Sequence, residues 1–211
     1  MKNEQTSLED IKAIRQMMEE SSKFLSLSGL SGVAAGLFAL LGAAVAHFII
    51  LDQGGNLYNE FMVSLKGANT SFVRIGLFSD ALAVLVLAVS SAWYLSWRHA
   101  RKNGNRFWTH TARKMAWNMF FVLAVGGLFS FILAWQENIR LVASTMLIFY
   151  GMALLMTSRY TQRDIKYLGY TEIGLGLLAG IFLNYGLLFW SLGFGVFHIV
   201  YGVAMYFKYE R

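Results

Sequence analysis

The sequence contains no cysteine and no proline in 211 residues. Without cysteine the chain can form neither a disulfide nor a thiolate metal site, and a cysteine nucleophile is excluded as well. Charged residues are also scarce, at 14% of the chain, whereas hydrophobic residues make up 56% and aromatic residues 16%. Soluble domains usually contain about 25% charged residues. The composition therefore predicts an integral membrane protein.

The motifs of common enzyme classes are absent too. We find no phosphate-binding Gly-Lys-Ser/Thr loop, no Gly-x-Ser-x-Gly elbow and no His-Glu-x-x-His pair. No close-spaced group of histidines and carboxylates has the pattern of a metal site. We therefore expect no enzyme activity, no catalytic residues, no cofactor and no bound metal. The net charge of +6 is explained by membrane topology, so we expect no nucleic-acid partner.

The basic residues indicate an orientation. The connector from Arg98 to Lys114 contains no acidic residue and six basic ones: Arg98, Arg101, Lys102, Arg106, Arg113 and Lys114. Lys and Arg in short connectors are retained on the cytoplasmic side of a membrane. With this connector inside, only Lys66, Arg74 and Arg140 of the 18 basic residues lie outside. Arg101, Lys102 and Arg106 are also candidates to bind anionic lipid headgroups, although topology alone accounts for them.

Apolar runs predict six membrane-spanning helices, at about 25–51, 72–97, 115–135, 141–157, 167–183 and 187–207. The fold class is thus an all-α integral membrane protein, a bundle of helical hairpins formed by residues 25–211. In the first span, Ser28, Gly32 and Gly36 place small side chains on one face, where another helix is expected to pack. A separate cytoplasmic amphipathic helix is predicted over residues 1–24. Thr6 and Glu9 have capping-box spacing, and Leu8, Ile11, Ile14 and Met18 then recur at roughly helical spacing. We expect no cleavable signal, and a retained first span.

Three segments carry a resemblance to known proteins: 150–161 (YGMALLMTSRYT), 164–173 (DIKYLGYTEI) and 198–202 (HIVYG). They resemble a family of small bacterial inner-membrane proteins that has no assigned activity. The resemblance implies six helices and a bacterial cytoplasmic membrane, and it brings no catalytic residues with it. In architecture alone, the hairpin layout also resembles the acid-resistance membrane proteins of the HdeD type.

Four polar residues within the predicted spans are candidate site residues: Asp80, His198, Glu172 and Asn118. An ionisable group at the bilayer centre costs roughly 2.5–3.5 kcal/mol, so each needs a reason to be there. Asp80 and His198 lie at similar depths, and they can hydrogen-bond if their helices are neighbours. Such a pair relays protons or simply fixes the helix register. Glu172 and Asn118 lie near the inner ends of their helices, where Glu172 either pairs with Asn118 or stays hydrated.

These observations lead to two hypotheses about function. The first is a non-enzymatic, multi-pass protein of the bacterial inner membrane, with both termini in the cytoplasm and a structural, sensory or partner-binding role. Its partners are the lipid bilayer and either further copies of itself or another membrane protein. The alternative is a small transporter or channel, coupled to protons, that uses Asp80, His198 and Glu172.

Overall fold

The structure of the protein is a computed structural model that describes residues 28–51, 70–104, 106–136 and 138–211, without the side chains of 51 and 70–74. The helix predicted over 1–24 lies outside this part of the chain. Most of the backbone in the described ranges is helical and none of it forms a strand, so the prediction of an all-α fold is confirmed.

Six long helices make up the described chain. They are α2 (Gly29–Val45) with its π-helical extension η1 (Ala46–Leu51), α4 (Thr70–Lys102), α5 (His110–Trp135), α6 (Val142–Thr157), α7 (Ile165–Ile181) and a composite last helix of α8 (Gly186–Trp190), π-helical η5 (Ser191–Phe197) and α9 (His198–Tyr209). Single 3₁₀ turns, η3 (Ile139–Leu141) and η4 (Leu183–Tyr185), precede α6 and α8.

Five helical segments in the described chain are long and apolar enough to cross a membrane. They are Gly29–Ile50, Ile75–Lys102, His110–Trp135, Ile139–Thr157 and Leu183–Tyr209. Helix α7 has 17 residues and is therefore about 26 Å long, slightly shorter than a hydrocarbon core of about 30 Å. The architecture is that of a multi-pass membrane protein.

The predicted basic connector is largely helical. Helix α4 continues to Lys102 and α5 begins at His110, so the irregular part is shorter than the polar stretch suggested. Polar residues do not break a helix, and no proline stops α4 earlier. The turn uses Gly104, whose φ of 68° is a left-handed conformation that glycine adopts readily. Thr109 then caps α5, because its side chain accepts a hydrogen bond of 3.1 Å from the Ala112 amide.

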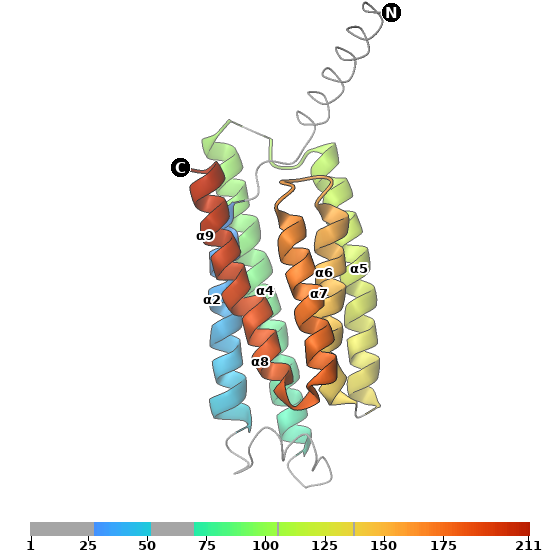
Figure 1. Cartoon of the computed structure of the whole chain (residues 1–211). Helices are drawn as coiled ribbons and strands as arrows, with labels where there is room; N and C mark the ends of the chain where they lie inside the picture. Colours follow the sequence, from blue (N-terminus) through green and yellow to red (C-terminus); the bar gives the residue numbers. More distant parts are fainter. Residues whose placement is uncertain (1–27, 52–69, 105, 137) are drawn as a thin grey trace, which may run out of the picture.

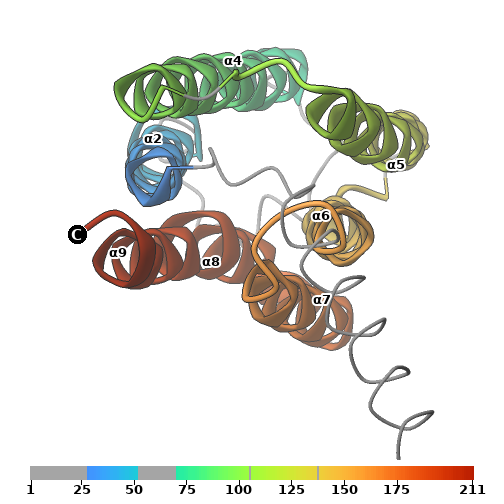
Figure 2. The ribbon, with the colours of Figure 1, turned by 90° about the horizontal axis from the view of Figure 1, so that it is seen from above.

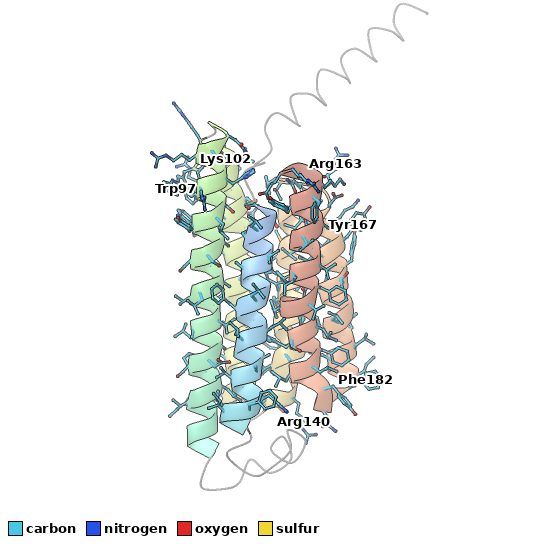
Figure 3. The ribbon with its side chains drawn as sticks, turned by 90° about the vertical axis from the view of Figure 1, so that its left-hand side faces the viewer. Trp97, Lys102, Arg140, Arg163, Tyr167 and Phe182 are labelled. Carbon is cyan, nitrogen blue, oxygen red and sulfur yellow. The ribbon has the colours of Figure 1, made fainter. Side chains whose placement is uncertain are left out.

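The helices form two groups of three (Figures 1 and 2). Helix α2 packs between α4 and α9, and α6 packs between α5 and α7. The composite last helix joins the groups, since η5 packs on α2 while α8 packs on α6 and α7. Lys102 and Arg163 mark one end of the bundle, which we call the basic end; Arg140 and Phe182 mark the opposite end (Figure 3). The C-terminus also lies at the basic end.

Glycines bring α2 into backbone contact with the last helix. A Cβ atom added to Gly202 would lie 2.6 Å from both the Gly29 carbonyl oxygen and the Val33 nitrogen. One added to Gly36 would lie 2.6 Å from the Gly195 carbonyl oxygen. The small-residue face predicted for the first helix therefore does meet another helix, and the approach is too close for any larger side chain.

A second glycine contact joins α6 and α7. A Cβ atom added to Gly151 would lie 2.6 Å from the Gly169 carbonyl oxygen. Further along, the Ser144 hydroxyl donates a hydrogen bond of 2.6 Å to the Gly176 carbonyl oxygen. Two helix pairs, α2 with α9 and α6 with α7, are thus held by direct backbone approach.

Glu210 caps the beginning of α2. Its carboxylate accepts a hydrogen bond from the Gly29 amide and another, of 3.1 Å, from the Ser28 hydroxyl. The negative charge lies at a helix N-terminus, where the helix dipole favours it. His99 of α4 also approaches this carboxylate, with Nδ1 at 3.4 Å from Oε2. Residues from three helices therefore meet at the basic end.

The α2–α9 contact predicts that Gly202→Ala destabilises the protein. The added methyl group collides with backbone atoms that cannot move aside, and overpacking of this kind costs about 1–3 kcal/mol. Gly127→Ala in α5 is a matched control, because nothing lies within 4 Å of its Cβ position. Thermal unfolding in detergent should show a lower Tm for Gly202→Ala and an unchanged or higher Tm for Gly127→Ala. Equal Tm values would contradict the proposed packing.

Candidate functional site

Two of the predicted polar residues, Glu172 and His198, meet in the interior of the bundle. His198 Nδ1 of α9 lies 3.4 Å from Glu172 Oε1 of α7, and His198 Nε2 lies 2.7 Å from the Tyr150 hydroxyl of α6. Each side chain comes from the middle portion of its helix, so the group is distant from both bundle ends. We call Tyr150, Glu172 and His198 the buried centre.

The carboxyl group of the buried centre has an unusual environment. The Glu172 side chain is 0% exposed, and neither of its oxygens has a hydrogen-bond partner among the described residues. A buried carboxylate without a compensating charge or hydrogen bonds is strongly destabilised. The geometry therefore favours either a protonated Glu172 or a carboxylate facing a positively charged His198, and in both cases the pair holds one proton more than a carboxylate beside a neutral imidazole.

The hydrogen bonds of His198 restrict where its protons lie. Nδ1 is 2.9 Å from the Gly193 carbonyl oxygen, which can only accept, so Nδ1 carries a proton. In the neutral ring, Nε2 accepts a hydrogen bond from the Tyr150 hydroxyl. In the charged ring, Nε2 instead donates to the Tyr150 oxygen. Proton uptake by His198 thus reverses the direction of its hydrogen bond with Tyr150.

Gly193 allows the carboxyl group to approach the last helix. A Cβ atom at this position would lie 2.5 Å from Glu172 Oε2 and 2.5 Å from Leu147 Cδ2. Gly193 lies in η5, where the chain is π-helical immediately before His198. Interruptions of this kind within α-helices occur frequently at functional sites. The irregular segment therefore provides both the carbonyl group that binds His198 and the space that Glu172 occupies.

Aromatic rings cover the side of the buried centre that faces away from the basic end. Phe194 lies 5.0 Å from Tyr150 and 5.9 Å from His198 between ring centroids, and Trp190 lies 5.2 Å from Phe194. Trp190, Phe194 and His198 are spaced four residues apart, so they follow one face of the helix. Of these two covering side chains, Phe194 has no polar group and Trp190 has only its indole N–H.

Toward the basic end, by contrast, the interior contains polar atoms that lack partners. The Tyr201 hydroxyl and Gln162 Oε1 are buried and have no hydrogen-bond partner within the described part of the chain. Tyr201 follows His198 by three residues, and it packs with Tyr150 against Leu154 and its buried neighbours. Gln162 lies in the connector between α6 and α7. Such atoms normally bind water when protein partners are lacking.

Asp164 lies at the surface of the basic end, where it joins α7 to the end of α9. Its carboxylate accepts hydrogen bonds from Lys208 Nζ at 2.5 Å and from the Tyr209 hydroxyl at 2.9 Å. The Lys208 hydrogen bond, aided by that from Tyr209, holds the pKa of Asp164 below its ordinary value of 3.8 against the opposing effect of burial. These contacts attach the end of α9 to the beginning of α7.

The structure does not form the predicted pair of Asp80 and His198. Helix α2 stands between α4 and α9 (Figure 2), so the helices that carry the two residues are not neighbours. Asp80 instead lies against α2, with its Oδ2 3.4 Å from the Cβ position of Gly42. The prediction rested on equal depth, and depth alone does not say which helices are adjacent.

The two predictions for Glu172 near the inner end are also wrong. Asn118 Nδ2 donates a hydrogen bond of 3.2 Å to the Tyr160 hydroxyl and does not pair with Glu172. Glu172 also does not lie at a hydrated surface, because it is completely buried within the bundle. The reason is the start of α7 at Ile165, which places Glu172 about 10 Å along the helix, deeper than the sequence suggested.

Sequence reasoning missed Tyr150, Gly193 and Glu210. A tyrosine or a glycine in an apolar span has no obvious cost, so nothing marked the first two. Glu210 did carry a signal, because an acidic residue at the C-terminal end of a helix opposes the helix dipole and calls for a partner. Comparisons of the chain with models of known families, with curated proteins and with solved structures found no match.

The buried centre predicts that Tyr150→Phe lowers stability. The substitution keeps the ring and removes the hydrogen bond to His198 Nε2, which leaves a buried polar atom unpaired at a cost of about 1–3 kcal/mol. Tyr170→Phe on the exposed face of α7 serves as the control. Chemical unfolding in mixed micelles should separate the two variants. A Tyr150→Phe variant as stable as Tyr170→Phe would show that the 2.7 Å contact contributes nothing.

The Asp164 contacts predict a pH dependence. Because the folded-state pKa is lowered, the ion pair contributes stability above pH 3.8 and loses it as the pH falls through the folded-state pKa. Lys208→Met should therefore destabilise the protein at neutral pH and have a smaller effect near pH 3. The difference in Tm between wild type and variant, measured at both pH values, checks this. A difference that is constant with pH would rule out the ion pair as its source.

Proposed function

We propose that the protein is a non-enzymatic, multi-pass membrane protein with a sensory role, in which the buried centre responds to the pH at the basic end of the bundle. The observation that carries this proposal is the complete burial of Glu172 at 3.4 Å from His198. Imidazole titrates near physiological pH, and small changes in its surroundings move that transition. A carboxyl–imidazole pair whose geometry favours an additional proton is therefore suited to detect one.

The response would pass from the proton to the backbone of the last helix. When His198 gains or loses a proton, its hydrogen bond with Tyr150 reverses direction, and its attraction to Glu172 changes. The same imidazole binds the carbonyl group of Gly193 in η5. A change in this ring therefore acts on the π-helical segment, which packs on α2 as well as on α7. The two groups of helices would shift relative to each other.

The distribution of polar atoms favours sensing over transport. Tyr201 and Gln162 lie on the basic-end side of His198, while Phe194 and Trp190 cover the opposite side. Transport requires access from both sides in turn, whereas a sensor needs access from only one.

The location we propose is the bacterial inner membrane, with the basic end and both termini in the cytoplasm. The positive charge of the α4–α5 end supports this orientation. The sensor would then report the pH of the cytoplasm. It would act on a membrane partner, which is either a second copy of the chain or a different protein in the bilayer.

A proton-coupled transporter or channel remains the second candidate. It is favoured by the meeting of two of its proposed residues, Glu172 and His198. The third residue, Asp80, lies in the α2–α4 contact and is separated from them by α2. Transport through these three residues would thus require a rearrangement that brings α4 to α9.

A test of the sensor compares amide hydrogen exchange in η5 and α9 between about pH 5 and pH 8 in reconstituted vesicles. After correction for the intrinsic exchange rate, the wild type should show a change in protection of these segments with pH. Glu172→Gln mimics the neutral carboxyl group and should abolish most of that change. Asp80→Asn removes another intramembrane acid outside the centre and should leave the change intact.

Two results would argue against sensing at the buried centre. One is a Glu172→Gln variant with the full pH response of the wild type. The other is proton flux into vesicles, detected with an internal pH dye, that both Asp80→Asn and His198→Ala eliminate. The second result would favour the transporter.

A further inference from the structure

The basic end carries a surface of exposed cationic side chains that no acidic side chain among the described residues neutralises. We call it the cationic surface; it comprises Arg98, Arg101, Lys102, Arg106, Arg113 and Lys114. No acidic residue occurs between positions 98 and 114. None of the six forms an ion pair with any described residue.

The described acidic residues are already engaged elsewhere. Glu210 caps α2 and faces His99, while Asp164 binds Lys208. Glu172 and Asp80 lie within the bundle. Like charges at neighbouring positions repel each other, and Arg113 lies close to the N-terminus of α5, where the helix dipole disfavours a cation. An anion from outside the described chain would relieve both effects.

Aromatic residues set the level of the cationic surface relative to a membrane. Trp93, Tyr94, Trp97 and Trp108 are 53%, 56%, 40% and 53% exposed. Exposed Trp and Tyr side chains mark the headgroup level of membrane proteins. The cations follow these rings directly along α4 and in the turn to α5, so they lie at the level where lipid phosphates are found.

The aromatic contacts also hold the turn against α4. Trp93 lies 4.9 Å from Phe107 and 5.3 Å from Trp108 between ring centroids, which fixes the turn beside the last part of α4. The guanidinium group of Arg101 lies 5.5 Å from the centre of the Trp97 ring. These contacts bring cations from α4, from the turn and from the beginning of α5 together beside one group of aromatic rings.

We propose that the cationic surface binds the headgroups of anionic phospholipids. Four of its six cations are arginines, and the planar guanidinium group pairs with two phosphate oxygens at once. Retention of a connector on one side of the membrane needs positive charge only, and lysine supplies it equally well. The aromatic side chains place the cations at headgroup level, and the lack of nearby carboxylates leaves the cations free to bind phosphate.

The test measures the relative affinity of the full-length protein for phosphatidylglycerol over phosphatidylcholine. Brominated lipids of each type quench tryptophan fluorescence in reconstituted vesicles, and Trp93, Trp97 and Trp108 lie next to the surface. Each cation near a charged membrane contributes up to about fivefold in affinity. The wild type should prefer phosphatidylglycerol by about fivefold or more at low salt and lose most of this preference at high salt.

Two triple variants separate this surface from general charge at the basic end. Arg101→Gln with Lys102→Gln and Arg106→Gln should reduce the preference to near one. Arg159→Gln with Arg163→Gln and Lys166→Gln removes the same charge from the α6–α7 connector at the same end and should keep most of the preference. Equal losses in both variants, or no loss in the first, would overturn the proposal.

Two further variants test the chemistry and the occupant. Arg98→Lys combined with Arg101→Lys, Arg106→Lys and Arg113→Lys keeps the charge, and should weaken the preference while leaving the topology unchanged. The N-terminal segment is a competing occupant because it contains five acidic residues, Glu4, Glu9, Asp10, Glu19 and Glu20. Changing these five residues to their amides should leave the preference within about twofold of the wild type. A several-fold increase would show that this segment covers the surface and would overturn lipid binding as its role.

Discussion

The close approach of helix backbones at glycines determines how this bundle is assembled. Hydrophobic side chains give helices little reason to associate in lipid, so direct packing and hydrogen bonds must hold them together. Gly36 and Gly202 serve this purpose between α2 and the last helix, and Gly151 serves it between α6 and α7. The distances leave no room for a methyl group at these positions.

The last helix also approaches its neighbours closely at glycines, and it does so on two sides. In η5, Gly195 faces Leu40 of α2, while Gly193 faces Glu172 of α7 and Leu147 of α6. One irregular segment therefore touches both groups of helices through two glycines that are separated by Phe194. A histidine placed directly after such a segment is well situated to influence how the groups fit together. The position of the titratable pair and the packing of the bundle thus have a common origin.

The buried centre and the cationic surface place different demands on the protein. The centre is buried, so Glu172 faces the imidazole of His198 and not bulk water. The surface presents its charges outward, where salt weakens them. Both are nevertheless related to the basic end, because the buried polar atoms of Tyr201 and Gln162 lie between the centre and that end. Proton sensing and lipid contact would consequently be influenced by the same side of the membrane.

Much of the fold was accessible from the sequence, because apolar length and basic connectors depend on local composition. Which helices pack against each other was harder to predict, and so was the composition of the buried centre. Glu172 and His198 were identified as costly residues in an apolar span, but their pairing depends on which helices are neighbours. Tyr150 joins His198 across 48 positions, a distance over which helical periodicity carries no information. The ends of α4 and α5 were misjudged because charged residues resemble a loop and yet sustain a helix.

The capping of α2 by Glu210 has a consequence for biosynthesis. The two partners are separated by 181 positions, so the first described helix enters the membrane long before the residue that caps it has been made. Its initial amide groups must rely on water or on transient partners during that interval. The finished arrangement of α2, α4 and α9 can form only after the final helix has been inserted. Packing of α9 against α2 is consequently a later step than insertion of α2, and it waits for translation of the last span.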